Sequence, residues 1–159
     1  MPTENQVRGE WGEKQVAKLV DCQVCRARKL SQLAGSFPSL DLVCRNCGGY
    51  LAQVKTPKMD AAKAPDWRPR TLMGAGWNPL QVQMSIGSMR DLYVVGAIPH
   101  RSTYRLAWID RVPGPALLAN ADVFEYRLAV IGGGTRRHAM FNIAYHRIPP
   151  ACVINVFTA

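Results

Sequence analysis

Two pairs of cysteines constrain this sequence more than any other feature. Cys22 and Cys25 form the first pair, Cys44 and Cys47 form the second, and eighteen residues separate the two pairs. Zinc prefers four soft ligands in a tetrahedron, and two residues between cysteines let one tight turn present both sulfurs. The spacing therefore predicts a structural zinc site over residues 22–47, with no open coordination position for catalysis.

The residues around these pairs agree with a zinc site. Gly48 and Gly49 follow the second pair and permit the positive φ angles that a zinc-binding turn uses. Two disulfides are the alternative, although cysteines that serve as metal thiolates fit the cytoplasmic location that we expect by default. Cys152 stays outside the set, and we expect it to be a small buried apolar residue.

Length, composition and charge limit the class of protein. A chain of 159 residues with 48% hydrophobic residues suits one globular domain over residues 1–159. No apolar run reaches the roughly 18–20 residues of a membrane span, and the polar N-terminus lacks a signal-peptide core, so no membrane association is expected. The formal net charge of +9 favours an anionic partner, of which nucleic acid is the usual one, over simple solubility.

A β-hairpin is predicted around the second cysteine pair. Residues Leu40–Val43 and Tyr50–Lys55 read as two strands that follow each other through the zinc-binding turn, so they should pair. The period of two along a strand places Gln53 and Lys55 on one face of the second strand. We therefore expect Asp41, Gln53 and Lys55 to converge.

These three residues resemble the catalytic set of the PD-(D/E)xK nucleases, in which an acid precedes a (D/E/Q)-x-K triplet. Asp41 would bind Mg²⁺ through oxygen, and the metal would polarise the scissile phosphate and lower the pKa of a bound water. Lys55 would position that water and neutralise developing charge. Gln53 would supply a neutral carbonyl oxygen as a second magnesium ligand, and the backbone carbonyl of Val54 a further one. Pro38 stands three residues before Asp41 instead of one.

A helix is predicted before the first cysteine pair. Residues 1–6 read as a frayed tail, and from Arg8 to Val20 the apolar positions fall roughly on one helical face. Glu10 and Glu13 lie one turn apart on this helix. On the pattern alone they form a solvated acidic face beside two lysines.

Two basic segments are candidates for contact with DNA. Residues 55–70 read as a polar, proline-rich loop, in which Trp67 either stacks on a base or packs back onto the core. The glycines at 132–134 predict a flexible turn with a basic tip that could grip phosphate. His138 and His146 are interpreted as surface or core residues instead of catalytic bases. The candidate DNA contacts are Lys58, Lys63, Arg68, Arg70, Arg136 and Arg137.

The C-terminal half of the chain is predicted to be mainly strands. A helix should first run from an Asn78 N-cap with Pro79 in its first turn to about Met89. Strand-like runs then follow at Leu92–Ile98, Tyr104–Ile109, Phe124–Ile131 and Cys152–Phe157, with a shorter one at Ala139–Tyr145.

Taken together, the chain resembles the catalytic domain of the DpnI-like methyl-directed restriction endonucleases. One resembling region comprises Glu13, the cysteine pairs, the segment 38–47 and the triplet Gln53-Val-Lys55. A second region comprises residues 141–143, 148–149 and 153–154. The similarity extends from about residue 5 to residue 157.

The resemblance implies an α/β (α+β) fold in which helices flank a mixed sheet that carries an inserted four-cysteine knuckle. It implies a structural Zn²⁺, a catalytic Mg²⁺ and cleavage of double-stranded DNA, with methylated DNA as a candidate substrate. It puts Asp41, Gln53 and Lys55 at catalytic positions and makes Glu13 an accessory acid. The sequence departs from the family in two ways: Gln53 replaces a carboxylate after one extra residue, and no C-terminal winged-helix domain is expected.

Three functions stay open at this point. The first is a DNA endonuclease, for which a homodimer is a further expectation because two strand breaks commonly call for two active sites. The second is a nuclease-like module that binds nucleic acid without cutting it, as the missing carboxylate at Gln53 suggests. The third is a protein unrelated to nucleic acid that a zinc knuckle stabilises.

Overall fold

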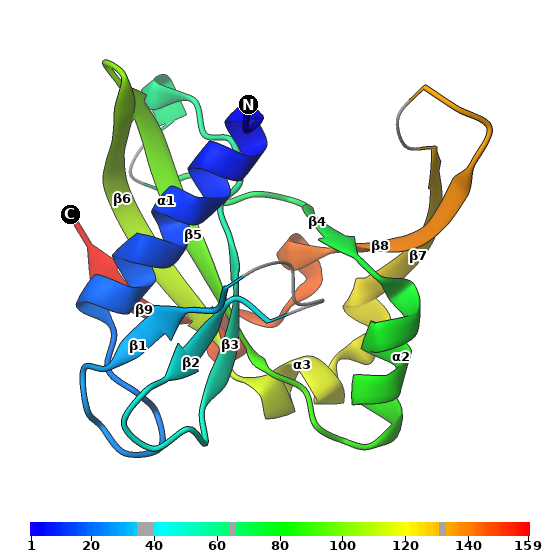
Figure 1. The fold of residues 1–159 in the computed structure, drawn as a ribbon, viewed down its shortest axis with the longest axis horizontal. Coiled ribbons are helices and arrows are strands. Elements are labelled where there is room, and N and C mark those ends of the chain that lie inside the picture. Colours follow the sequence, from blue (N-terminus) through cyan, green and yellow to red (C-terminus); the bar gives the residue numbers. More distant parts are fainter. Residues whose placement is uncertain (35–39, 64–65, 131–132) are drawn as a thin grey trace.

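The structure, a computed structural model, describes residues 1–34, 40–63, 66–130 and 133–159. Its larger sheet is mixed and has six strands (Figure 1). Neighbouring strands are antiparallel except β3 and β5, which are parallel. In spatial order the strands are β1 (Leu30–Gln32), β2 (Leu42–Cys44), β3 (Leu51–Lys55), β5 (Asp91–His100), β6 (Thr103–Val112) and β9 (Ile154–Thr158).

A smaller antiparallel sheet lies to one side of the larger one. Its strands, in spatial order, are β4 (Leu72–Ala75), β8 (Arg137–Ile143) and β7 (Phe124–Val130). Helices α2 (Trp77–Ser85) and α3 (Gly114–Ala119) lie at the same end of the molecule, and β7 and β8 project from it as a hairpin (Figure 1). The 3-10 turns are η1 (Ala61–Lys63), η2 (Ala121–Val123), η3 (Tyr145–Arg147) and η4 (Pro150–Cys152).

Helix α1 (Glu4–Leu19) begins earlier than the sequence predicts. Thr3 is its N-cap: the Thr3 side chain accepts a hydrogen bond from Gln6 N, and the Gln6 side chain accepts one from Thr3 N at 2.7 Å. This reciprocal capping box satisfies two backbone donors of the first turn. The prediction of a frayed tail over residues 1–6 is therefore wrong from Glu4 onward.

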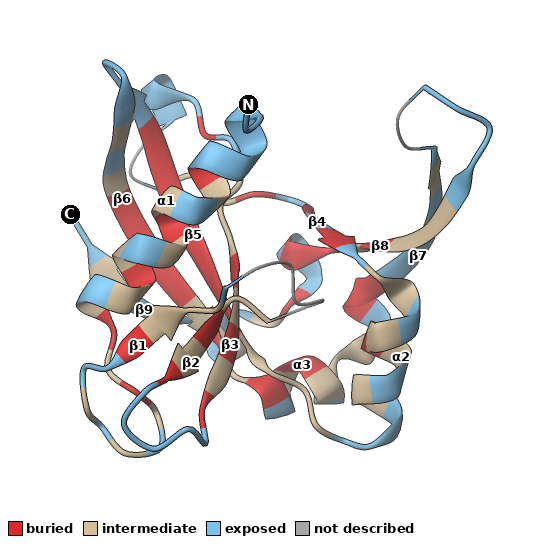
Figure 2. Ribbon diagram, in the orientation of Figure 1, coloured by how far each residue is buried: buried red, intermediate tan, exposed pale blue. Residues whose placement is uncertain are grey.

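The larger sheet separates two hydrophobic cores. Along β5, Tyr93 and Val95 face the core beneath α1, whereas Leu92 and Val94 face the core shared with the smaller sheet. Because successive side chains of a strand point to opposite faces, a strand buried on both sides reads as an unbroken apolar run. Figure 2 shows β5 buried along most of its length.

Most predicted elements of the C-terminal half are confirmed. All five strand-like runs contain strands, β5 to β9. Helix α2 starts at Trp77, one residue before the predicted N-cap, because Gly76 caps it in the left-handed conformation with φ of +78°. The helix also ends at Ser85 instead of Met89, just before Gly87 with φ of +65°. Strands β1 and β4 and helix α3 were not predicted.

Parts of several expectations lie outside the described residues: Pro38, residues 64–65 of the predicted loop, Ile131 at the end of a predicted strand, and Gly132 of the glycine turn. Among the helices that the structure describes, none combines the length and the apolar character that crossing a membrane requires.

Candidate zinc centre and active site

The four paired cysteines come together as the sequence predicts. Their sulfurs all lie within 4.8 Å of one another, with 3.7 Å from Cys22 to Cys47 and 3.6 Å from Cys25 to Cys44. Zinc–sulfur bonds of about 2.3 Å in a regular tetrahedron place sulfurs about 3.8 Å apart. A disulfide needs about 2.0 Å. The cysteines are free, so two disulfides are wrong and the donor set fits Zn²⁺.

The two halves of the cluster are equivalent turns. Arg26 N donates to Cys22 O at 3.0 Å, and Gly48 N donates to Cys44 O at 2.9 Å. The residue after each pair has a positive φ, +66° at Arg26 and +65° at Gly48. The prediction for Gly48 is confirmed, and Arg26 takes up the same conformation despite its side chain.

Amide groups around the sulfurs favour thiolates, the form of cysteine that binds metal. Val24 N and Cys25 N donate to Cys22 Sγ at 3.3 and 3.4 Å. Asn46 Nδ2 donates to Cys25 Sγ at 3.4 Å, and this hydrogen bond is the main cause that lowers the pKa of Cys25 to about 6. The pKa of Cys44 is lowered as well, whereas that of Cys47 is raised to about 11, because its hydrogen bond from Gly49 N, which lowers the pKa, is outweighed by burial and the neighbouring thiols. The placement of the four sulfurs is therefore what shows that the cluster could hold a zinc ion.

The second turn connects the hairpin that the sequence predicts. Strands β2 and β3 are antiparallel, with Leu42 opposite Ala52 and Val43 opposite Leu51. Strand β1 pairs with the outer side of β2, where Leu30 lies opposite Cys44. A zinc ion would thus tie the segment leading into β1 to the hairpin.

Asp41 is fixed against the second strand of this hairpin. Asp41 N donates to Ala52 O at 3.0 Å, and Asp41 Oδ2 accepts a hydrogen bond from Val54 N at 2.6 Å. These two contacts lie on either side of Gln53, which is half-buried. Burial raises the pKa of the Asp41 carboxyl, while the Val54 N–H and the Lys55 charge act in the opposite direction.

Lys55 and Glu13 complete a group of three charged side chains. Burial lowers the pKa of Lys55, although its attraction to Asp41 and Glu13 opposes the shift. Burial also raises the pKa of Glu13, and repulsion from Asp41 adds to this. Gln32 Nε2 donates to Glu13 Oε2 at 2.8 Å and holds the carboxyl group beside β1. Glu13 is therefore half-buried near Asp41 and Lys55 and does not lie on a solvated face.

A close approach between α1 and the end of β3 brings Glu13 to the hairpin. Gly12 lies against Thr56, and a Cβ at this position would overlap Thr56 Oγ1. The buried Arg8 donates through Nε to Thr56 O at 2.9 Å. Sequence reasoning missed Gly12, Arg8 and Gln32 as positioning residues. Only Gly12 carried a signal, since a glycine inside a helical pattern often marks close packing.

The charged group does not by itself make a complete metal cage. Within the described residues, the four cysteines are the only group of three or more Cys, His, Asp and Glu side chains that could hold a metal ion. Asp41 and Glu13 contribute two carboxylates beside Lys55. Gln53 and backbone carbonyls are the further oxygen donors within this part of the chain.

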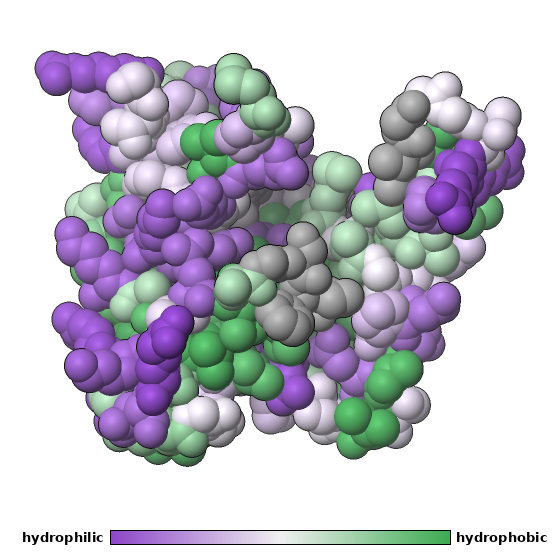
Figure 3. Space-filling view, viewed as in Figure 1, coloured by the Kyte–Doolittle hydropathy of each residue, from purple (hydrophilic) through white to green (hydrophobic). Residues whose placement is uncertain are grey.

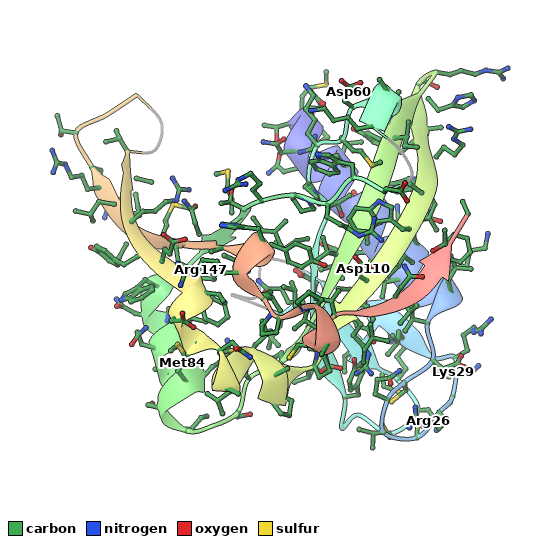
Figure 4. The ribbon with its side chains drawn as sticks, turned by 180° about the vertical axis from the view of Figure 1, so that it is seen from behind. Arg26, Lys29, Asp60, Met84, Asp110 and Arg147 are labelled. Atoms are coloured by element: carbon green, nitrogen blue, oxygen red, sulfur yellow. The ribbon has the colours of Figure 1, made fainter. Side chains whose placement is uncertain are left out.

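The candidate DNA contacts have different surroundings. Lys58, Lys63, Arg70, Arg136 and Arg137 are exposed. Arg68 is instead partly buried: its guanidinium donates to Asp110 and stacks 3.8 Å over the Trp108 ring. Asp110 itself is buried within the molecule (Figure 4). Trp67 is partly buried and packs against the core, which was one of its two predicted roles.

Other predictions around these segments can be placed as well. Lys58 Nζ lies 3.8 Å from Glu4 Oε1, a contact between exposed groups. His146 is exposed, and its Nδ1 lies 2.8 Å from Arg70 O, whereas His138 is partly buried. Cys152 is only partly buried and packs against the core.

The site lies in the middle of the molecule, where β2 begins and β3 ends (Figure 1). Figure 3 shows the surface hollowed between the side formed by α1 and the β5–β6 hairpin and the side formed by the β7–β8 hairpin. Searches against known protein families and against characterised proteins find no match for this chain. The geometry and chemistry of the site therefore carry the functional argument.

Proposed function

We propose that this protein is a metal-dependent DNA endonuclease whose active site is formed by Asp41, Gln53, Lys55 and Glu13. The observation that carries the proposal is the gathering of two carboxyl groups and a lysine at the end of a hairpin that a four-cysteine cluster holds. Burial shifts the pKa of each of the three groups toward its uncharged form. Groups whose pKa values are shifted together by burial and charged neighbours are concentrated at functional sites.

The carboxyl groups fit a divalent cation. Asp41 and Glu13 repel each other, and burial raises the pKa of both, so a bound cation would relieve an unfavourable negative potential. Mg²⁺ takes oxygen ligands, which Asp41, Gln53 and Glu13 offer. When bound, Mg²⁺ would polarise the scissile phosphate and make its bound water more acidic.

Lys55 would supply the reaction with a positive charge and with a group that can transfer a proton. Its pKa is lowered by burial, which brings its proton transfer closer to neutral pH. In this role the ammonium orients the attacking water and offsets the charge that develops on the phosphate. Gln32 holds Glu13 in place, and Val54 N holds Asp41, so the acids are positioned before substrate binds.

The resemblance to the DpnI-like methyl-directed endonucleases supports a more specific form of the proposal. The mixed sheet with helices and the cysteine cluster agree with what that resemblance implies. We extend the proposal to the PD-(D/E)xK fold, to a structural Zn²⁺, and to double-stranded, methylated DNA as the substrate of a cytoplasmic restriction enzyme. The zinc would stabilise the hairpin and take no part in the chemistry.

A second candidate function is binding of nucleic acid without cleavage. It is favoured by Gln53, a neutral residue where a metal ligand with a charge is usual, and by the hydrogen bond from Val54 N that occupies one oxygen of Asp41. The net charge of +9 supports both functions equally.

Plasmid cleavage distinguishes the two functions. Purified protein is incubated with adenine-methylated, cytosine-methylated and unmethylated plasmid, in Mg²⁺, Mn²⁺ or EDTA, beside the Asp41→Asn variant. The endonuclease predicts cleavage that requires metal, favours one methylated plasmid and is lost in Asp41→Asn. Retention of zinc and of the circular dichroism spectrum shows that the variant is folded. Salt-sensitive DNA binding by the wild type, with no cleavage in either metal, would instead establish the binding module.

A further inference from the structure

The β7–β8 hairpin projects away from the body of the protein (Figure 1). Its two strands are paired from Phe124 opposite Ile143 to Val130 opposite Arg137. The outer part of this hairpin, residues 126–130 and 133–140, extends beyond the core. We call these residues the arm.

The charge of the arm has one sign. The arm contains Arg127, Arg136, Arg137 and His138 and no aspartate or glutamate. Arg136 and Arg137 are exposed at its tip. An acid-free projection of this kind is complementary to a polyanion.

One face of the arm is apolar and open to solvent. Tyr126, Leu128 and Val130 alternate along β7, and their exposed fractions are 51%, 53% and 59%. Since side chains opposite each other in an antiparallel pair share a face, Arg137 lies beside Val130 on this same face. A row of exposed apolar side chains that ends in a guanidinium indicates a surface that meets a partner.

We propose that the arm enters the major groove of duplex DNA and reads base edges there. The major groove of B-DNA admits a two-stranded β-ribbon, and apolar side chains contact thymine methyl groups while arginine recognises guanine. The major groove of A-form RNA is too deep and narrow for side chains to read. The proposal rests on the proposed function for the identity of the substrate, but it concerns binding and a separate part of the chain.

The position of the arm supports a duplex instead of a second copy of this chain. The arm forms one side of the hollow, and α1, the helix that carries Glu13, forms part of the other side (Figures 1 and 3), so DNA held by the arm would extend toward the candidate active site. Each copy also carries a net charge of +9, which opposes self-association and favours a polyanion.

The test measures binding without cleavage. Fluorescence anisotropy with a labelled methylated duplex in EDTA gives the Kd over a range of salt concentrations. The first variant combines Arg136→Ala with Arg137→Ala, and the second combines Leu128→Ser with Val130→Ser. The control combines Lys18→Ala with Lys29→Ala and removes two positive charges at exposed positions outside the arm, the cysteine cluster and the candidate active site. Lys29 lies at the opposite end of the molecule from the arm (Figure 4).

The arginine variant should bind about ten-fold or more weakly, and its binding should depend less on salt, because two positive charges that displace counterions from the duplex are removed. The serine variant should keep the salt dependence and lose preference between duplexes of different sequence, because base contacts specify whereas phosphate contacts position. The control should bind like the wild type, and an RNA duplex of the same sequence should bind more weakly than DNA.

Equal Kd values for both arm variants and the wild type would overturn the proposal even if the protein cleaves DNA. A dimer in sedimentation that the serine variant dissociates, with DNA binding unchanged, would also overturn it and would assign the apolar face to a second copy. If the arm variants bind weakly but the wild type never cleaves, the proposed endonuclease fails and the arm proposal stands.

Discussion

At the scale of single residues, the candidate site consists of charges that the fold removes from water at a cost in stability. Lys55 shows this most clearly. Its pKa is lowered because the loss of hydration outweighs its attraction to Asp41 and Glu13. The folded state therefore disfavours the ammonium relative to the unfolded chain, and the stability that Lys55 contributes is lost as pH falls through its lowered pKa.

This imbalance predicts that Lys55→Met stabilises the protein at neutral pH. Methionine keeps the length of the side chain and removes the charge that burial disfavours. Thermal unfolding should show a higher Tm, by about 2–4 °C for each kcal/mol regained in a domain of this size. Lys29→Met, at an exposed position, is the matched control and should leave Tm nearly unchanged. A lower Tm for Lys55→Met would show that Lys55 is a structural ion-pair partner.

Residue-scale contacts also separate structural cations from those free to meet DNA. Arg68 pairs with Asp110, which additionally accepts a hydrogen bond from Tyr145 Oη at 3.2 Å and one from Asn155 Nδ2 at 3.0 Å. Nothing in the sequence distinguishes Arg68 from Arg70, because a buried acid on a distant strand decides the difference. Charge counting alone therefore overestimated the basic surface of this loop.

At the scale of secondary-structure elements, the four-cysteine cluster is the feature that holds the hairpin in place. Strands β2 and β3 are three and five residues long. A short isolated hairpin is marginally stable in water. The cysteine cluster and the pairing of β3 with β5 add the stability that so short a hairpin lacks by itself.

Removal of zinc should therefore abolish activity without removing any catalytic side chain. Purified protein should contain one zinc ion per chain by elemental analysis. Chelation should lower Tm and stop cleavage in excess Mg²⁺, because the segment that carries Asp41 and Lys55 loses its anchor. Cys152→Ser should keep its zinc and serves as the control. Full activity of zinc-free protein would contradict the anchoring role.

The hairpin and the cysteine cluster were predictable because both signals are local. Ligand spacing and period-two alternation act over a few residues, and the chain obeys both. Strand β1 was missed because three residues are too few to show a period, and its partner β2 lies ten or more residues away. The capping box at Thr3 and Gln6 was also readable but was not used, so the start of α1 was set too late.

At the scale of the whole molecule, the site depends on elements that sequence patterns do not bring together. Helix α1 reaches the hairpin because Gly12 lets the helix approach Thr56 closely. Gln32 of β1 then donates a hydrogen bond to the Glu13 carboxyl group. Tyr50 Oη donates to Asp91 Oδ2 at 2.6 Å, and Asp91 also accepts from Arg111 at 2.9 Å and Gly114 N at 2.8 Å. This network joins the hairpin to β5, β6 and the start of α3, so the site rests on the core of the molecule.

The central claim is that the lysine at the end of β3 works in metal-dependent hydrolysis of DNA. The most direct measurement compares cleavage of methylated plasmid in Mg²⁺ by the wild type, Lys55→Met and Lys29→Met, each with its zinc content and Tm recorded. Our account predicts that Lys29→Met cleaves like the wild type, whereas Lys55→Met stays folded, keeps its zinc and cleaves at least about a hundred-fold more slowly, as expected when a group that stabilises developing charge is removed. Cleavage by Lys55→Met at the wild-type rate would contradict the account.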